Sequence, residues 1–253
     1  SQLLQVDVVI HLAGVNRSRN DSSFIKGNSD LTKKMCEILM KSERKIPVIF
    51  SSSVKSGENT IYGSSKLLAE EYLISLSKNN GNPISIFRLP NVFGKWCKAN
   101  YNSVVATFCY NIANDLPITI DDPNKVLKLV HVDSVVEALI NSIKKIKKGI
   151  NFPAVTPIYK ISLGKLSAHL HSFLDLRRAL ILERVGSGFK RVLYSTFISY
   201  LPPHKFVLDI PTYSDPRGSF SEIVKEMLET VNCQKRLFLE PTRGSKRIVA
   251  PNA

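Results

Sequence analysis

The chain has 253 residues, 43% of them hydrophobic, which suits one large domain, or one domain with an appendage, around a buried core. No apolar run reaches the roughly 18 residues that span a bilayer, and the first residues lack a signal-peptide pattern, so we expect a soluble, cytoplasmic chain without a membrane partner. The net charge of +14 gathers in lysines 144–148 and after residue 231. Neither cluster interleaves aromatic residues, and nucleic acid is not expected as a partner.

Apolar runs bounded by polar turns alternate with helical patterns along the first 150 residues. We predict strands at residues 8–10, 48–50, 84–88 and 126–130, and helices at about 30–40, 64–77, 104–113 and 132–143. This alternation is typical of βα units and a parallel sheet, and it predicts the α/β fold class. Beyond Gly149 the rhythm fades.

The cysteines Cys36, Cys97, Cys109 and Cys233 are scattered, without the spacing of a zinc finger or a disulfide framework. No histidine cluster follows His204, so we expect no metal site.

The stretch from Tyr62 to Lys66 points to proton chemistry. Four residues apart on a helix, the two side chains share one face, where an ammonium favours the ionised form of a neighbouring phenol. The alternative is an exposed aromatic residue beside a solvated lysine. A strand that ends in three serines, followed by a short turn and then this pair, favours catalysis, because a serine hydroxyl there could hold the same substrate oxygen.

Five motifs in this order resemble the extended short-chain dehydrogenase/reductase family, which contains nucleotide-sugar epimerases, dehydratases and reductases. They are residues 7–14, the serines 51–53, residues 62–66, residues 88–94 and residues 131–133. The resemblance implies a doubly wound, Rossmann-like parallel sheet. It also implies a nicotinamide cofactor, NADP or NAD, and a possible homodimer paired through helices that flank the active site.

Residues 94–98, 100–110, 193–196 and 215–220 are similar to one branch of this family, the reductases of capsular polysaccharide synthesis that carry a C-terminal cupin domain. That likeness implies NADPH-dependent reduction of a UDP-linked 4-keto-6-deoxy-N-acetylamino sugar, on the route to UDP-N-acetyl-L-fucosamine. Two alternatives stay open. One is an epimerase or dehydratase of the same family, and the other is a non-catalytic module that binds a nucleotide sugar.

Carried over by position, the resemblance makes Tyr62 the acid that protonates the keto oxygen. Lys66 would hold the nicotinamide ribose and act on the phenol. Ser53, the serine furthest from the strand, would be the hydroxyl donor, with Ser52 as the second choice. His131 is expected to be a structural residue at a strand end.

Binding residues follow from the same resemblance. Leu12, Ala13 and Gly14 would line the cofactor, where small residues allow its close approach. Asn91 would contact the sugar or the diphosphate, although an asparagine after a proline is equally typical of a turn. Arg88 is the second candidate for the substrate.

The chain departs from the family at both ends. It lacks the glycine-rich turn that holds the cofactor pyrophosphate, and its first strand corresponds to a later strand of the fold. We therefore expect an incomplete sheet with exposed apolar edges and poor solubility. The predicted domains are a partial reductase domain at 1–205, the start of a cupin at 206–230 and a frameshifted or disordered tail at 231–253.

Overall fold

A computed structural model describes residues 2–182, 185–216, 218–221, 225–226, 238–242 and 245–249. The chain forms two units, one made of Ser1–Val104 and Val126–Ile161, the other of Val105–Lys125 and Ser162–Ala253. The first unit holds η1 (Gln2–Leu4), β1 (Val9–His11), α1 (Asp21–Phe24), η2 (Ile25–Asp30), α2 (Leu31–Leu39), β2 (Val48–Ser53), α3 (Ile61–Asn80), β3 (Ile84–Leu89), β4 (Asn91–Phe93), β5 (Val126–His131), α5 (Val132–Lys144), β6 (Ile150–Asn151) and most of β7 (Tyr159–Ser162).

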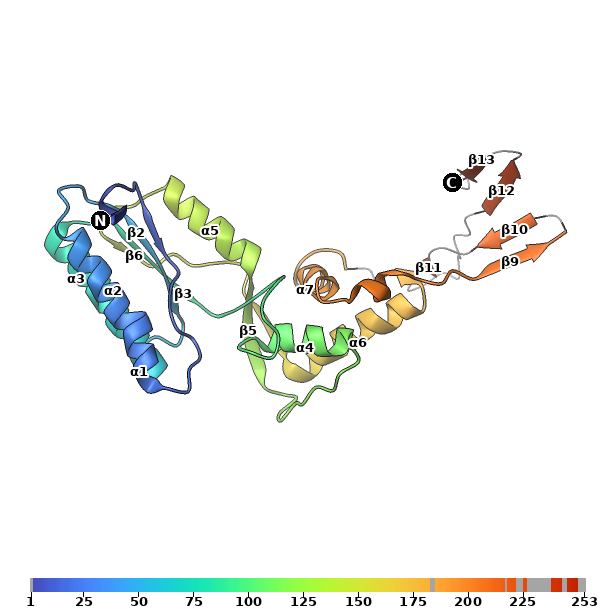
Figure 1. Ribbon diagram of the computed structural model, residues 1–253, viewed down its shortest axis with the longest axis horizontal. Coiled ribbons are helices and arrows are strands. Elements are labelled where there is room, and N and C mark those ends of the chain that lie inside the picture. The colour runs from blue at the N-terminus through green and yellow to red at the C-terminus, as the bar shows by residue number, and fades with distance from the viewer. Residues whose placement is uncertain are drawn as a thin grey trace. The chain divides into compact units, whose positions relative to one another are not determined.

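The first unit is built on a parallel sheet in the order β1-β2-β3-β6. Val48 of β2 pairs with Val9 of β1 on one side and with Ile84 of β3 on the other. Helices α2 and α3 cover one face of the sheet and α5 covers the opposite face (Figure 1). The predicted parallel α/β sheet of Rossmann type is thus confirmed.

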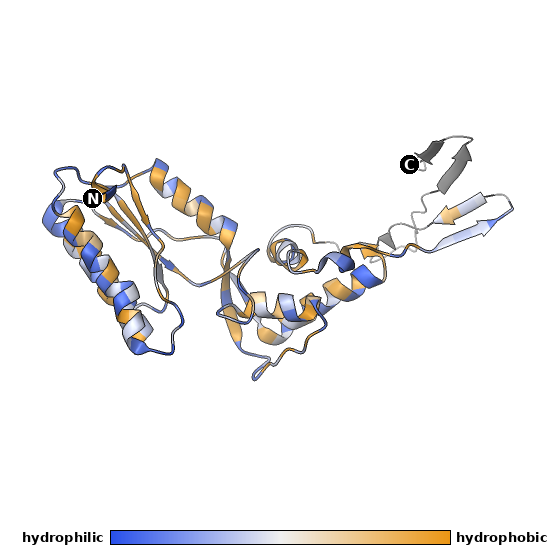
Figure 2. Cartoon of the chain, in the orientation of Figure 1, coloured by the Kyte–Doolittle hydropathy of each residue, from blue (hydrophilic) through white to orange (hydrophobic). Residues whose placement is uncertain are grey.

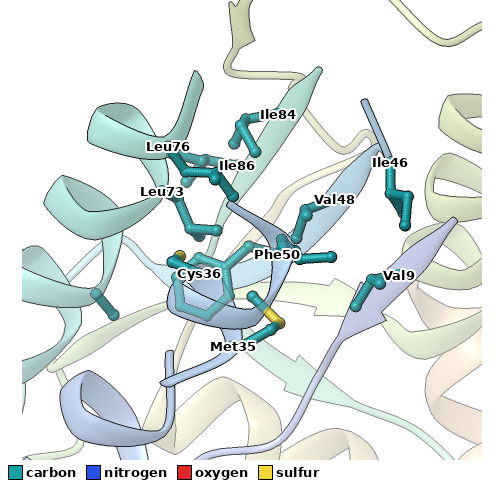
Figure 3. Close-up of a cluster of buried hydrophobic side chains, with 12 residues drawn as sticks. Val9, Met35, Cys36, Ile46, Val48, Phe50, Leu73, Leu76, Ile84 and Ile86 are labelled. Carbon is teal, nitrogen blue, oxygen red and sulfur yellow. The ribbon is translucent and has the colours of Figure 1, made fainter. Parts of the chain in front are cut away.

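The central strands β2 and β3 have buried side chains on both faces, which explains why their sequences read as continuous apolar runs, largely orange in Figure 2. On the α2 and α3 side, the core joins Met35 and Leu73 of the helices to Val48, Phe50 and Ile84 of the strands (Figure 3). Each such side chain contributes about 1.5–3 kcal/mol by leaving water. The core under α5 contains Ile49, Phe87, Val130, Val135 and Leu139.

Helix α3 carries the Tyr62–Lys66 pair and begins three residues before the predicted start. The side chain of Thr60 accepts a hydrogen bond from the Gly63 amide at 3.0 Å, which satisfies a free donor of the first turn. The helix ends at Gly81, whose φ of 80° is open to glycine and strained for other residues. These two caps fix the position of Tyr62 in the first turn.

Strand β1 is an end strand of its sheet, and Ile10 and Leu12 beside that edge are exposed. This agrees with the expected exposed apolar edge. A separate three-stranded sheet, in the order β4-β5-β7, begins directly after Pro90. The predicted helices at 104–113 and 132–143 match α4 and α5 within one residue.

The second unit contains most of α4 (Val104–Ala113), α6 (Leu163–Arg178), β8 (Ile181–Leu182), α7 (Phe189–Ile198), η3 (Pro203–Phe206), β9 (Thr212–Asp215), β10 (Gly218–Ser221), β11 (Lys225–Glu226), β12 (Phe238–Thr242) and β13 (Ser245–Val249). Helices α6 and α7 pack through aromatic rings, with Phe173 5.1 Å from Tyr194 and 6.0 Å from Phe197 between centroids. Because the alternation of apolar runs and helical patterns fades after Gly149, these two helices were not predicted from the sequence.

The predicted start of a cupin contains the antiparallel pair β9–β10. Most of the predicted tail at 231–253 lies outside the described residues, apart from the paired strands β12 and β13. Within the described part of the chain, no helix is both long enough and apolar enough to cross a membrane.

Candidate active site

Tyr62 and Lys66 lie on the first turns of α3, just beyond the carboxyl end of β2, where parallel sheets commonly place their ligands. The half-buried ring of Tyr62 meets Phe24 of α1 edge-on, at 6.0 Å between centroids. Lys66 is only 6% exposed, and its Nζ donates to the carbonyl oxygen of Ser51 at 3.1 Å. The same nitrogen lies 4.9 Å from the ring centroid of Phe50. Both residues belong to α3, four positions apart, the spacing on which their predicted joint action rests.

Electrostatics at Lys66 are set first by its burial, which lowers the pKa of its ammonium. The nearby carboxylate of Glu70, one helical turn later, acts in the opposite direction. His11 on β1 has its pKa lowered to about 4, mainly by burial and further by the Lys66 charge, so this imidazole is neutral near pH 7.

A hydrogen-bond chain assigns the tautomer of His11. The Thr32 hydroxyl donates to the carbonyl of Asn28 at 2.7 Å, and the oxygen of that hydroxyl lies 2.9 Å from Nε2 of His11. Because the hydroxyl proton is already committed, Nε2 carries the proton and donates to Thr32. The His11 imidazole is therefore held in one orientation as a hydrogen-bond donor to Thr32.

The three serines of β2 have different partners. Ser51 Oγ donates to the carbonyl of His11 at 3.4 Å, and Ser52 Oγ donates to Glu70 at 2.5 Å. Ser53 Oγ accepts from the amide of Lys55 at 3.2 Å, a bond that leaves its own proton for another acceptor. The hydroxyl proton of Ser52 is thus engaged by Glu70, and the choice of Ser53 as the donor to substrate stays a prediction.

Asn28 is a residue that the sequence reasoning missed. It is buried in the π-helical turn η2, a kind of turn that is frequent at functional sites. Its amide accepts from the Val15 N–H at 2.8 Å and donates to the Val15 carbonyl at 3.0 Å and to Ser65 Oγ at 2.9 Å. Ser65 in turn donates to the carbonyl of Tyr62 at 2.8 Å. Asn28 thus ties the loop after β1 to the helix that bears the catalytic candidates.

Gly14 lies directly against this cluster. A Cβ added at Gly14 would stand 2.7 Å from Oδ1 of Asn28 and 3.3 Å from Nζ of Lys66. The structure therefore brings Gly14 and Lys66 together, whereas Leu12, 57% exposed, and Ala13 lie on the open part of the same loop. A bare glycine backbone, a buried ammonium and a half-buried phenol fit a nicotinamide and its ribose.

The two predicted substrate residues already have protein partners. The Arg88 guanidinium, 46% exposed, donates to both carboxylate oxygens of Glu70, with a shortest distance of 2.6 Å. Asn91 is exposed and begins β4 instead of forming a turn, and its amide donates to the carbonyl of Lys128 at 3.3 Å.

His131 ends β5 and caps α5, accepting from the Asp133 amide at 3.4 Å. This agrees with the structural role expected for it. Burial lowers its pKa, against the opposing charge of Asp133.

One cavity of about 490 Å³ opens between β3, α5 and residues 151–156. Its lining includes Ser85, Glu137, Asn141, Lys145 and Phe152 but none of the predicted site residues.

Among the residues that the structure covers, no three histidine, cysteine or acidic side chains gather as a metal site would need. Cys36 and Cys109 are buried free thiols, and burial raises the pKa of Cys36 to about 12. Cys233 lies outside the described residues.

A known family and several known proteins are similar to this chain. Residues 1–155 match the model of the NAD dependent epimerase/dehydratase family. Over 221 residues, the chain is 45% identical to a UDP-2-acetamido-2,6-beta-L-arabino-hexul-4-ose reductase of Pseudomonas aeruginosa, covering 87% of this chain and 59% of the relative.

Among solved structures, the capsular polysaccharide assembling protein CapF of Staphylococcus aureus is 38% identical, with a TM-score of 0.77 over 88% of this chain and 60% of that one. A UDP-glucuronic acid 4-epimerase of Bacillus cereus, solved with NAD, shares the fold at 18% identity and a TM-score of 0.65, over 79% of this chain and 76% of that one. The chain thus spans about three fifths of the length of the reductase and of CapF. Since the family model matches more than half of its residues, the chain belongs to the NAD dependent epimerase/dehydratase family.

Proposed function

We propose that this chain is the reductase portion of an enzyme that uses NADPH or NADH to reduce a UDP-linked 4-keto-6-deoxy-N-acetylamino sugar for capsular polysaccharide synthesis. The observation that carries the proposal is the buried Lys66 ammonium, one helical turn after Tyr62 and against the bare backbone of Gly14. The similarity to the Pseudomonas aeruginosa reductase supports the choice of substrate class.

In this proposal the chain's own residues handle the proton. When bound, the reduced nicotinamide supplies a hydride to the carbonyl carbon of the sugar. Tyr62 donates its phenolic proton to the carbonyl oxygen, and the product is an alcohol. The Lys66 ammonium stabilises the phenolate left behind, and Ser53 donates a hydrogen bond that holds the same oxygen in place.

The predicted binding residues complete the proposed site. Gly14, with Leu12 and Ala13, lets the cofactor approach the backbone after β1, and Lys66 holds its ribose. Asn91, exposed on β4, contacts the sugar or the diphosphate, and Arg88 does so through its exposed half.

Turnover of NADPH with the UDP-keto sugar, followed by absorbance, tests this function. The assay uses the chain preceded by the glycine-rich βα units that the family resemblance predicts, because those units supply the pyrophosphate site. Tyr62→Phe should lower turnover by about 10²–10⁴-fold, the usual contribution of a general acid. Tyr72→Phe, ten residues along the same helix, is the matched control and should retain turnover. Full activity of Tyr62→Phe would show that the proposed acid is wrong.

An epimerase or dehydratase is the second candidate, favoured by the description of the family that residues 1–155 match. Such an enzyme regenerates its cofactor, whereas a net reductase consumes one NADPH for each sugar reduced. Analysis of product and cofactor in the same reaction separates the two. Binding of UDP-sugar without any turnover would instead indicate the non-catalytic module.

We also propose the organisation of the longer protein. Residues 1–205 belong to the reductase domain, 206–230 begin a cupin, and 231–253 form a tail of other origin. Sequencing of the DNA on both sides of the reading frame tests this arrangement. We further propose that the protein is a cytoplasmic homodimer, with the half-exposed Leu67 and Leu68 of α3 at the contact. Light scattering that gives a monomeric mass would contradict the dimer.

A further inference from the structure

Glu70 is a carboxylate with no exposure to solvent and with an unusually full set of donors. Ser52 Oγ donates to its Oε1 at 2.5 Å, and Arg88 donates to both oxygens, through Nε at 3.1 Å and Nη2 at 2.6 Å. The three residues come from β2, α3 and β3, so the carboxylate is clamped between helix and sheet. A carboxylate held by these donors is fixed in direction.

The clamped carboxylate follows Lys66 by one turn of α3, and both side chains are on the buried face of the helix. Burial alone favours the neutral amine at Lys66, and the charge of Glu70 opposes that effect. The other titratable groups of the site are Tyr62, one turn before Lys66 on α3, and His11 of β1, which is neutral and adds no charge. Glu70 is therefore the anion that compensates the buried ammonium.

The positive charge of Arg88 works against the effect of the Glu70 carboxylate on Lys66. The Lys66–Glu70–Arg88 cluster carries two positive charges and one negative charge, for a net charge of +1. Arg88 orients the carboxylate but also neutralises part of its field at Lys66. Its guanidinium carbon also lies 5.1 Å from the ring centroid of Phe152.

We propose that Glu70 is a positioning residue for Lys66: Ser52 and Arg88 hold its carboxylate one helical turn after Lys66, on the buried face of α3, where it compensates the ammonium. This inference rests on the proposed function in one respect only, that the charge of Lys66 assists proton transfer by Tyr62. It assigns Arg88 a role next to the catalytic pair in addition to its predicted contact with substrate.

Two substitutions with opposite expected effects on Lys66 test the inference in the full chain. The pKa of Lys66 is read by NMR from the Cε protons of ¹³C-labelled lysine, with the Lys66 signal identified by its loss in Lys66→Arg. Glu70→Gln should lower this pKa by about one pH unit, a tenfold shift toward the neutral amine, because the anion is gone and Arg88 stays. Arg88→Met should raise it, because the carboxylate then acts on Lys66 without a competing cation.

The neighbouring Glu71, exposed on the same helix, supplies the control, and Glu71→Gln should leave the Lys66 pKa unchanged. A merely structural role for Glu70 would move the pKa in the same direction in both variants or in neither. An unchanged pKa in Glu70→Gln, or a lowered one in Arg88→Met, overturns the proposal. If Glu70→Gln does not fold by circular dichroism, the sign measured in Arg88→Met decides. Because neither cofactor nor sugar is present, failure of the reductase proposal in turnover assays is distinguishable from failure here.

Discussion

Replacing Gly14 by alanine tests whether the loop after β1 and the helix α3 are held together as closely as the structure indicates. The added Cβ would stand 2.7 Å from Oδ1 of Asn28, inside the 3.0 Å limit that real Cβ contacts essentially never cross. The Asn28 amide must then move. It holds three hydrogen bonds, two to the backbone of Val15 and one to Ser65, all between 2.8 and 3.0 Å.

The expected cost follows from those bonds. Asn28 is buried, so a displaced amide leaves groups without a partner and without water, at about 1–3 kcal/mol for the set. Urea unfolding followed by circular dichroism measures this loss as a change in the free energy of unfolding. The same substitution in an Asn28→Ala background should cost less than about 0.5 kcal/mol, because the obstructing oxygen is absent.

Gly81→Ala is the control for the effect of any added methyl group. Nothing lies within 4 Å of its Cβ position, but its φ is 80°, so alanine costs about 1 kcal/mol there through the backbone alone. Gly81→Ala should therefore lower the free energy of unfolding by the same amount in the unchanged chain and in the Asn28→Ala background. If Gly14→Ala costs equally in both backgrounds, the contact between Gly14 and Asn28 is not what constrains the loop, and the reasoning is refuted.

Three further predictions follow from the same cluster. The pKa of His11 is about 4 in the folded chain against an ordinary 6.5, so unfolding takes up a proton between these values, and stability should fall by up to about 3 kcal/mol as the pH drops from 6.5 to 4. Urea midpoints across this range should show a smaller fall in His11→Gln, and an equal fall would contradict the assignment. Ser52→Ala should lower the free energy of unfolding by about 1–3 kcal/mol, because Glu70 loses a buried donor, whereas Ser53→Ala should change it by less than about 0.5 kcal/mol and act on turnover instead. Thr60→Ala removes the cap of α3 and should cost about 1 kcal/mol in the same unfolding assay, with Thr60→Ser retaining most of the stability.

The fold was predictable where local periodicity and burial agree. The helix at 104–113 matches α4, and the strand at 48–50 lies within β2, because continuous apolar runs are typical of elements buried on both sides. The start of α3 was missed by three residues, since the Thr60 cap is a local contact that an apolar pattern does not reveal. Strands β6 and β7, of two and four residues, are too short for any period to show.

The site was predictable in part. The spacing of Tyr62 and Lys66 placed them on one helix face, and the family resemblance led to Gly14, which the structure places beside Lys66. No sequence pattern pointed to Asn28, because its hydrogen-bond partners Val15 and Ser65 lie far from it in the sequence. No sequence pattern pointed to Glu70 either, since a glutamate on a helix ordinarily faces solvent. Its burial depends on the hydrogen bonds that Arg88 and Ser52 donate to it.

The alternation of side chains along β2 explains why its serines have different partners, which their order in the sequence did not reveal. Phe50 packs in the core on the α2 and α3 side, and Ile49 packs in the core under α5. With a period of two, Ser52 follows Phe50 toward α3, where it meets the carboxylate of Glu70. Ser53, the last residue of β2, accepts instead from the backbone amide of Lys55. The strand thus gives Ser52 a carboxylate partner and leaves Ser53 with a backbone amide. Exchange of these two environments would require a one-residue shift of β2 that also moves Phe50 out of its core.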